Sequence, residues 1–120
     1  MQIAAPNEDT SEMKMYVLVN RDILSLVQAG VQSCHAALEY SYNYNHLRTY
    51  NRWQNYHKTL IILEAKAYEI NAKMLECEKI NKTFMHFDEP DIGNRLTACC
   101  FEPMSSEEGK LLFGEFKLLS

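Results

Sequence analysis

The sequence predicts an α/β domain: a three-layer sandwich in which a mixed sheet of about four strands is flanked by helices. Two observations support this prediction: the alternation of two kinds of segment along the chain, and the order of elements that results. Short apolar runs rich in β-formers alternate with longer segments whose apolar residues recur every three or four positions. The resulting order is strand, helix, short helix, strand, helix, strand, strand, helix. This order favours parallel pairing wherever a helix connects two neighbouring strands.

Length and composition indicate one ordinary globular domain. A chain of 120 residues suits a single core, and 47% of the residues are hydrophobic and 23% charged. Residues 1–12 lack the basic start and apolar centre of a secretory signal. We interpret them as a flexible N-terminal tail that precedes a single domain over residues 13–120. No apolar run approaches the ~20 residues that cross a bilayer, so we expect a cytoplasmic protein without a membrane partner.

The cysteines, the histidines and the charge balance restrict the chemistry. Neither the four cysteines nor the four histidines have the spacing of a tetrahedral metal site, so we expect free thiols and no metal or other cofactor. A net charge of −4 argues against a chain that binds nucleic acid through its overall field.

Residues 40–58 have a composition of their own. They contain no acid, three bases (Arg48, Arg52 and Lys58), five tyrosines and Trp53. Such a segment can meet phosphates and stack on unpaired bases. It can equally be an aromatic helix face packed on the domain, which is the interpretation we favour.

The first strand and helix are the clearest elements. Residues 13–19 (Met-Lys-Met-Tyr-Val-Leu-Val) end in a continuous apolar run, which predicts a central strand covered on both faces. Asp22 can cap the next helix, which we expect to run to about Tyr42. The apolar residues of this helix predict its buried stripe: Ile23, Val27, Val31, Cys34 and Leu38. On this pattern Cys34 is a buried small hydrophobe rather than a nucleophile.

A polar line follows the same helix. Gln28, Gln32, His35 and Glu39 fall within about 60° of one another on the helical wheel, roughly 100° from the predicted buried stripe. The line therefore places Gln32 and His35 side by side at the edge of the core.

The rest of the chain continues the alternation. We first expect a short helix at 46–54, a buried strand at 59–63 and an amphipathic helix at 67–80. A strand at 83–87, a turn at 88–94 and a strand at 96–101 follow. The last helix begins at 105–108, and residues 116–119 can adopt an extended conformation. Parallel strands end at one edge of a sheet, where ligands collect. The start of the first helix and Asp88 are therefore expected at the same edge.

One motif resembles a known family. Gln32-Ser33-Cys34-His35-Ala36-Ala37 is similar to the Gln-Cys-Ser-His-Ala-Ala helix motif of the type II (archaeal and eukaryotic) peptidyl-tRNA hydrolases, with serine and cysteine transposed. Residues 15–22 resemble the opening strand of that family and its following Arg-x-Asp. Asp88 matches its aspartate after the third strand, and Thr97 matches a threonine before an apolar strand. The resemblance spans about residues 13–119.

The resemblance implies a fold and a reaction. The fold would be peptidyl-tRNA hydrolase II-like, and the reaction would be hydrolysis of the ester between a peptide and the terminal ribose of tRNA, with no cofactor. His35 would accept a proton from water, Asp88 would orient the imidazole or the water, and Thr97 would supply a hydroxyl donor. Gln32 would position the substrate or polarise the ester carbonyl. Substrate contacts are also expected from Gln28, Arg48 and Arg52, and the resemblance implies a homodimer.

The departures from the family keep other interpretations open. The family's lysine aligns with Gln28. Its Asp-Ala-Gly-Arg-Thr-Gln run is replaced by a shorter segment, residues 88–93, so one of the family's threonines has no equivalent in this sequence. The alternative function is a catalytically inactive fold relative that binds RNA or protein, and a third is a small-molecule esterase or amidase. Individually, His35 can be a surface histidine, Asp88 a turn cap and Thr97 a simple β-former.

Overall fold

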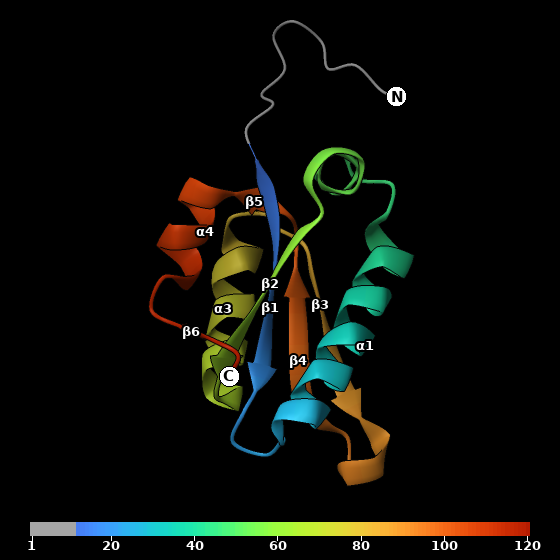
Figure 1. Cartoon of the computed structure of the whole chain (residues 1–120), viewed down its shortest axis with the longest axis vertical. Coiled ribbons are helices and arrows are strands. Elements are labelled where there is room, and N and C mark those ends of the chain that lie inside the picture. Colours follow the sequence, from blue (N-terminus) through green and yellow to red (C-terminus); the bar gives the residue numbers. More distant parts are fainter. Residues whose placement is uncertain (1–11) are drawn as a thin grey trace, which may run out of the picture.

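A computed structural model describes residues 12–120, so almost all of the predicted tail lies outside the described part of the chain (Figure 1). Six strands form one mixed sheet in the order β3-β4-β1-β2-β6, with β5 paired to β1. Their bounds are β1 Met13–Asn20, β2 Thr59–Ala65, β3 Phe84–Glu89, β4 Arg95–Phe101, β5 Met104–Ser105 and β6 Lys117–Leu118. The count exceeds the predicted four because β5 and β6, of two residues each, are too short to leave a periodic pattern.

The sheet is mixed because β1 and β2 are parallel, whereas β4 runs antiparallel to both β1 and β3. It follows that β3 runs in the same direction as β1. The central position predicted for β1 is confirmed, since it lies between β4 and β2 and Val17, Leu18 and Val19 are 0% exposed. The carboxyl ends of β1, β2 and β3 therefore share one edge of the sheet.

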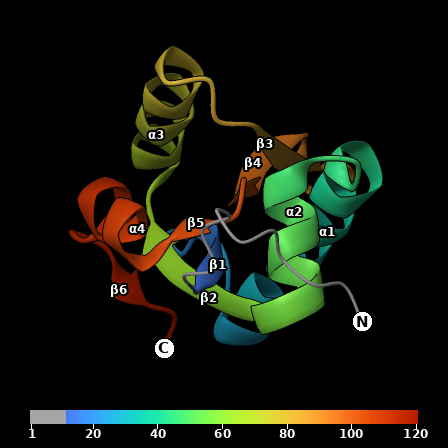
Figure 2. The ribbon, with the colours of Figure 1, turned by 90° about the horizontal axis from the view of Figure 1, so that it is seen from above.

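Helices cover both faces of the sheet and give the predicted three layers (Figure 2). Helix α1 (Leu26–Tyr44) and α2 (Arg48–Arg52), which continues into a π-helical turn at Trp53–His57, lie on one side. Helices α3 (Ala67–Lys79) and α4 (Ser106–Phe113) lie on the other. None of the helices within residues 12–120 is long and apolar enough to span a membrane.

The N-cap of helix α1 lies three residues after the predicted cap, Asp22. Ser25 is the N-cap: its hydroxyl accepts from the backbone N–H of Gln28, and the Gln28 side-chain oxygen accepts from the N–H of Ser25 at 2.9 Å. This reciprocal pair is a capping box. The residues before it form a turn because the Arg21 guanidinium donates to the carbonyl oxygen of Leu24 at 2.7 Å.

The predicted buried stripe of α1 is wrong, because the opposite side of the helix meets the sheet. The buried residues are Ala29, Gln32, Ser33, Ala36 and Tyr40. Small side chains allow the helix axis to approach the strands closely. This close packing outweighs the burial that the larger aliphatic residues on the other side would gain. Val27 and Leu38 are 77% and 68% exposed, and Cys34 is exposed as well rather than buried.

Most of the aromatic rings of residues 40–58 pack on the domain, as the favoured interpretation predicted, whereas Tyr42 and Tyr56 are exposed. Tyr40 is 0% exposed and its hydroxyl lies 2.8 Å from the Thr83 hydroxyl. Tyr50 and Trp53 pack against the same core, and the Trp53 indole N–H donates to the carbonyl oxygen of Thr59 at 2.7 Å. These aromatic rings therefore hold the C-terminal end of α1 against the sheet.

Candidate functional site

The candidate site lies where α1 begins and β3 ends, at the lower end of the molecule in Figure 1. A surface pocket there encloses about 320 Å³. Its lining comes from the start of α1 and from the end of β3 with the turn that follows: Leu24, Gln28, Val31, Gln32, His35, Glu89, Asp91 and Ile92. The pocket therefore lies at the predicted edge, and three residues of the predicted polar line, Gln28, Gln32 and His35, line it.

Gln32 is the centre of a hydrogen-bonded chain between α1, β3 and β4. Its Nε2 donates to Oε2 of Glu89 at 3.0 Å, and its Oε1 faces the hydroxyl of Thr97 at 3.2 Å. The carboxylate can only accept, so this chain fixes which end of the Gln32 amide faces Glu89. Gln32 is only 8% exposed, and Thr97 is fully buried. The amide is therefore held in one orientation at the wall of the pocket.

A β-bulge directs Thr97 toward α1. Phe87 pairs with Ala98, but the next residue, Asp88, pairs with Leu96, so Thr97 is an extra residue in β4. Its hydroxyl also donates to the carbonyl oxygen of Phe87 at 2.9 Å. The hydroxyl has a single proton, so the Phe87 carbonyl and the Gln32 amide oxygen share one donor. In this way the irregularity of the strand re-aims a side chain that regular alternation would send to the other face.

His35 lies at the open side of the pocket. Its imidazole is exposed and stacks on the ring of Phe87, with centroids 4.6 Å apart and planes inclined by 10°. A flat stack restrains the ring plane while it leaves the ring edge, which carries both nitrogens, accessible to water. His35 therefore meets the geometric requirement for proton exchange with a molecule in the pocket.

The charged side chains that line the pocket are mainly acidic. The hydrogen bond from Gln32 holds the pKa of the Glu89 carboxyl below its usual value, and His35 contributes a smaller effect in the same direction. Asp91 adds a second carboxylate, and the lining residues include no lysine or arginine. Gln28 uses its side-chain oxygen in the capping box of α1. Among residues 12–120, no three His, Cys, Asp or Glu side chains group to hold a metal ion.

The structure brings Gln32, His35 and Thr97 together but not Asp88. Asp88 lies within β3, and its Oδ1 is 3.2 Å from Nδ1 of His86. Successive residues of a strand point to opposite faces. The carboxylate beside Gln32 therefore belongs to Glu89. Extending the predicted strand by two residues would have placed Phe87 and Glu89 together on the face toward α1.

Arg48 and Arg52 do not line this pocket. They belong to α2, beyond the other end of α1, and the rise from Gln32 to the end of α1 at Tyr44 alone is about 18 Å. Any role in substrate binding would therefore require a substrate that extends along the whole of α1.

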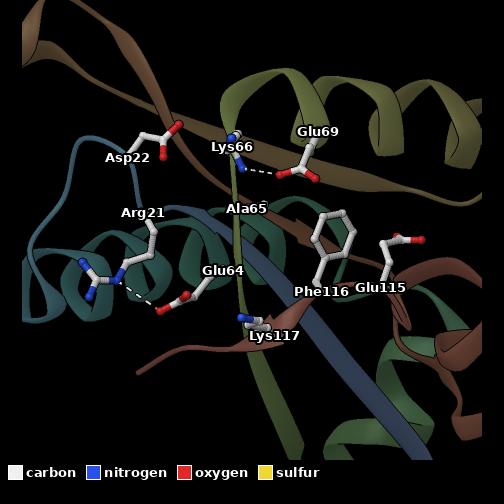
Figure 3. Close-up of a pocket in the computed structure, with 9 residues that line it drawn as sticks. All are labelled: Arg21, Asp22, Glu64, Ala65, Lys66, Glu69, Glu115, Phe116 and Lys117. Carbon is white, nitrogen blue, oxygen red and sulfur yellow. Dashed lines mark hydrogen bonds and ion pairs between the residues drawn. The ribbon is translucent and has the colours of Figure 1, made fainter.

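A second pocket of about 310 Å³ lies at the same edge on the α3 side (Figure 3). Several of its charged side chains have hydrogen-bond partners within the chain. Nε of Arg21 lies 3.3 Å from Oε1 of Glu64, which also accepts from the N–H of Ser120, while Glu69 accepts from the N–H of Lys66. The bonds of Arg21 and Glu64 anchor the loop after β1 and the segment after β6.

Comparison with known proteins agrees with this architecture. A solved structure of a protein of unknown function from Agrobacterium tumefaciens strain C58 superposes with a TM-score of 0.62 at 8% identity, covering 91% of this chain and 98% of that chain. At such low identity the likeness concerns the fold alone. No curated protein matches the chain. Residues 13–119 match the family model described as peptidyl-tRNA hydrolase PTH2, which is nearly the whole chain, and the chain therefore belongs to that family.

Proposed function

We propose that this protein hydrolyses the ester that joins a peptide to the terminal ribose of tRNA, in the pocket between α1 and the end of β3. Membership of the PTH2 family supports the reaction class. The observation that carries the site is the convergence of Gln32, Glu89 and Thr97 beside the exposed ring of His35. These residues come from three different elements, and one hydrogen-bonded chain orders the first three.

In this proposal His35 is the general base. Its imidazole takes a proton from a water molecule, the resulting hydroxide attacks the ester carbonyl carbon, and the bond to the ribose oxygen breaks. The same imidazolium then returns the proton to the leaving ribose oxygen. The products are a peptide with a free carboxylic acid, which loses its proton to solvent at neutral pH, and a tRNA with a free ribose hydroxyl.

Gln32 is the proposed donor to the ester carbonyl. Its Nε2 carries two protons, of which one is donated to Glu89. The second is available to an oxygen that becomes negative as hydroxide adds. Thr97 is fully buried and bonded to Gln32 and Phe87, so we assign it a positioning role rather than direct contact with substrate.

The carboxylate of the site is Glu89 in this proposal, in place of the Asp88 that the sequence comparison suggested. Glu89 orients Gln32 and lines the same pocket as His35, whereas Asp88 is bonded to His86. Glu89 therefore has the contacts that a carboxylate of the site needs.

The test is release of an N-blocked amino acid from purified N-blocked aminoacyl-tRNA. We expect turnover above the buffer rate and a fall in kcat of about 10²–10⁴-fold for His35→Ala, the usual contribution of a general base. Turnover equal to buffer, with an active control hydrolase in the same assay, would overturn the proposal.

Two matched variants locate the carboxylate. Glu89→Gln and Asp88→Asn each replace one carboxylate by its amide on adjacent residues of β3. We expect Glu89→Gln to lower kcat and Asp88→Asn to leave it near the wild-type value. The opposite ranking would return the role to Asp88 while leaving the hydrolase proposal intact.

The lack of lysine and arginine among the residues that line the pocket favours one alternative, a fold relative that binds RNA or protein without turnover. Its basis is Gln28 at the lysine position and the two carboxylates of Glu89 and Asp91. It predicts binding of the N-blocked aminoacyl-tRNA, or of a protein, with no release of the amino acid. Measured hydrolysis that depends on His35 excludes it.

A further inference from the structure

Strand β3 forms one edge of the sheet and is six residues long. Within residues 12–120 it pairs with β4 alone. Proteins commonly protect an edge strand by keeping it short or by placing lysine or proline on it. At the opposite side of the sheet the last strand, β6, has two residues, whereas Phe84–Glu89 contains neither lysine nor proline. The edge of β3 is therefore able to accept another strand.

The pairing with β4 determines which main-chain groups of β3 point outward. The N–H of Glu102 donates to the carbonyl oxygen of Thr83 at 2.9 Å. At the other end of the strand, the N–H of Asn94 donates to the carbonyl oxygen of Glu89 at 3.0 Å. In an antiparallel ladder, alternate residues turn both main-chain groups toward the partner strand, and the residues between them turn both groups away. The outward N–H and C=O groups, which we call the free edge, are those of Phe84, His86 and Asp88.

The free edge leads into the candidate site. Strand β3 runs toward the end of the sheet at which α1 begins (Figure 1). Its last residue, Glu89, lines the pocket together with Gln32 and His35. A chain that binds along the free edge in the direction of β3 would therefore end in the pocket.

The side of α1 that borders β3 carries exposed apolar residues. The ring of His35 stacks on Phe87 of β3, which shows which side of the helix this is. Val31 and Tyr42 lie within about 40° of His35 on the helical wheel. They are 50% and 83% exposed, and Val31 also lines the pocket. Apolar side chains beside a strand edge can pack on the side chains of an added strand whatever its sequence.

We propose that the peptide part of peptidyl-tRNA binds as an added strand on the free edge of β3. This proposal rests on the hydrolase function proposed above. Peptides attached to tRNA differ in sequence, and their main-chain N–H and C=O groups are the feature that they share. Addition of a strand to a sheet edge recognises a peptide through these groups.

The reaction determines the direction of the bound peptide. The esterified carbonyl is at the carboxyl terminus of the peptide and must reach Nε2 of Gln32, which lies beside Glu89 at the end of β3. The added strand therefore runs parallel to β3. At about 3.3 Å per residue, a peptide of about four residues extends from Glu89 back to His86.

Peptide length tests the proposal. The two substrates are N-acetyl-alanyl-tRNA and N-acetyl-penta-alanyl-tRNA, and we expect kcat/KM to be about tenfold higher for the longer one, mainly through a lower KM. Two main-chain hydrogen bonds of ordinary net strength account for a factor of this size. If neither substrate is hydrolysed, the hydrolase proposal and this one are both wrong. If both are hydrolysed with equal kcat/KM, the hydrolase proposal stands and the added strand is wrong.

Methylation of single peptide nitrogens locates the pairing. An added parallel strand uses every second N–H to bond the free edge. We therefore expect an N-methyl group to remove most of the gain in kcat/KM at alternate residues of the penta-alanyl chain, and little of it at the residues between them. Equal loss at every residue, or no loss at any, contradicts an added strand.

His86→Pro tests the same contact from the side of the protein. Proline removes the outward N–H of residue 86 without removing a hydrogen bond to β4. His86→Ala is the matched control because it removes the imidazole and keeps the N–H. The measurement is the ratio of kcat/KM for the long and short substrates, which cancels any effect common to both.

We expect this ratio to fall about threefold or more in His86→Pro, as for one lost hydrogen bond, and to keep its wild-type value in His86→Ala. Circular dichroism verifies that both variants are folded. A wild-type ratio in folded His86→Pro overturns the proposal. If His86→Pro does not fold, the N-methyl series on the wild-type protein decides.

Discussion

At the scale of single residues, the candidate site depends on the orientation of one amide. Gln32 is nearly buried, and its two side-chain atoms have different partners: Nε2 donates to Glu89, and Oε1 faces the hydroxyl of Thr97. A buried polar group without partners costs free energy, so the partners hold the amide rather than leaving it free to rotate. The site is therefore ordered before any substrate arrives.

Thr97→Val tests this arrangement. Valine keeps the shape of threonine but removes the hydroxyl donor that faces Gln32 and the carbonyl oxygen of Phe87. We expect the free energy of unfolding, measured by urea denaturation, to fall by about 1–3 kcal/mol because buried acceptors lose their donor. We also expect kcat to fall more than KM rises, since the donor to the transition state loses its orientation.

Thr97→Ser is the matched control because it keeps the hydroxyl. It should restore most of the lost kcat even though a methyl group is missing from the core. If Thr97→Val hydrolyses N-blocked aminoacyl-tRNA at the wild-type rate, Gln32 is not positioned through Thr97, and the proposed chain has no role in the reaction.

At the scale of elements, the sequence predicted the order and type of nearly every helix and long strand. Apolar periodicity was sufficient for this because each long element is amphipathic or wholly buried. It failed on which side of α1 is buried, since close packing through Ala29, Ser33 and Ala36 depends on the sheet opposite and not on the helix alone. Apolar periodicity also ended the predicted strand at Phe87, two residues before β3 ends at Glu89.

The same limit applies to the candidate site. Gln32 and His35 could be placed together from helical spacing, and the comparison with the family pointed to Thr97. Glu89 was missed because its direction depends on a strand that continues past Phe87. The bulge at Thr97 is a second feature that no local sequence pattern predicts, because it exists only in the pairing of β3 with β4.

A pair of substitutions in α1 tests which side faces the core. Ala36 is 0% exposed against the sheet, so Ala36→Leu should lower the free energy of unfolding by about 1–3 kcal/mol through overpacking. Leu38→Ala, at a residue 68% exposed, should change it by less than about 0.5 kcal/mol. Both are measured by urea denaturation. A loss of about 2–5 kcal/mol for Leu38→Ala, typical of a buried leucine, would contradict the orientation of α1.

At the scale of the whole molecule, segments from both ends of the described chain meet at the edge of β2. Leu119 donates its N–H to the carbonyl oxygen of Ile62, Ser120 donates its N–H to Oε1 of Glu64, and Arg21 donates both to Glu64 and to the carbonyl oxygen of Ser120. Glu64 thus joins the loop after β1 to the segment after β6. That loop leads directly into α1, so the same connection supports one wall of the candidate site.

Glu64→Gln tests this connection by hydrogen exchange. The hydrogen bond from Ser120 lowers the pKa of the Glu64 carboxyl below its usual value of 4.5, with a further contribution from Arg21. The ionised form is therefore favoured by folding. Its stabilising contribution is complete at neutral pH and is lost as the pH falls through the lowered pKa.

At pH 7, Glu64→Gln should mimic that loss and speed exchange of the Leu119 and Ser120 amides, while the amides of Val17 and Val19 in central β1 keep their protection. Glu107→Gln, at an exposed acid on α4, is the control and should change neither set. Equal exchange in the Glu64→Gln and wild-type chains would show that β6 and the residues after it are held by the strand pairing of Leu63 with Leu118 rather than by this carboxylate.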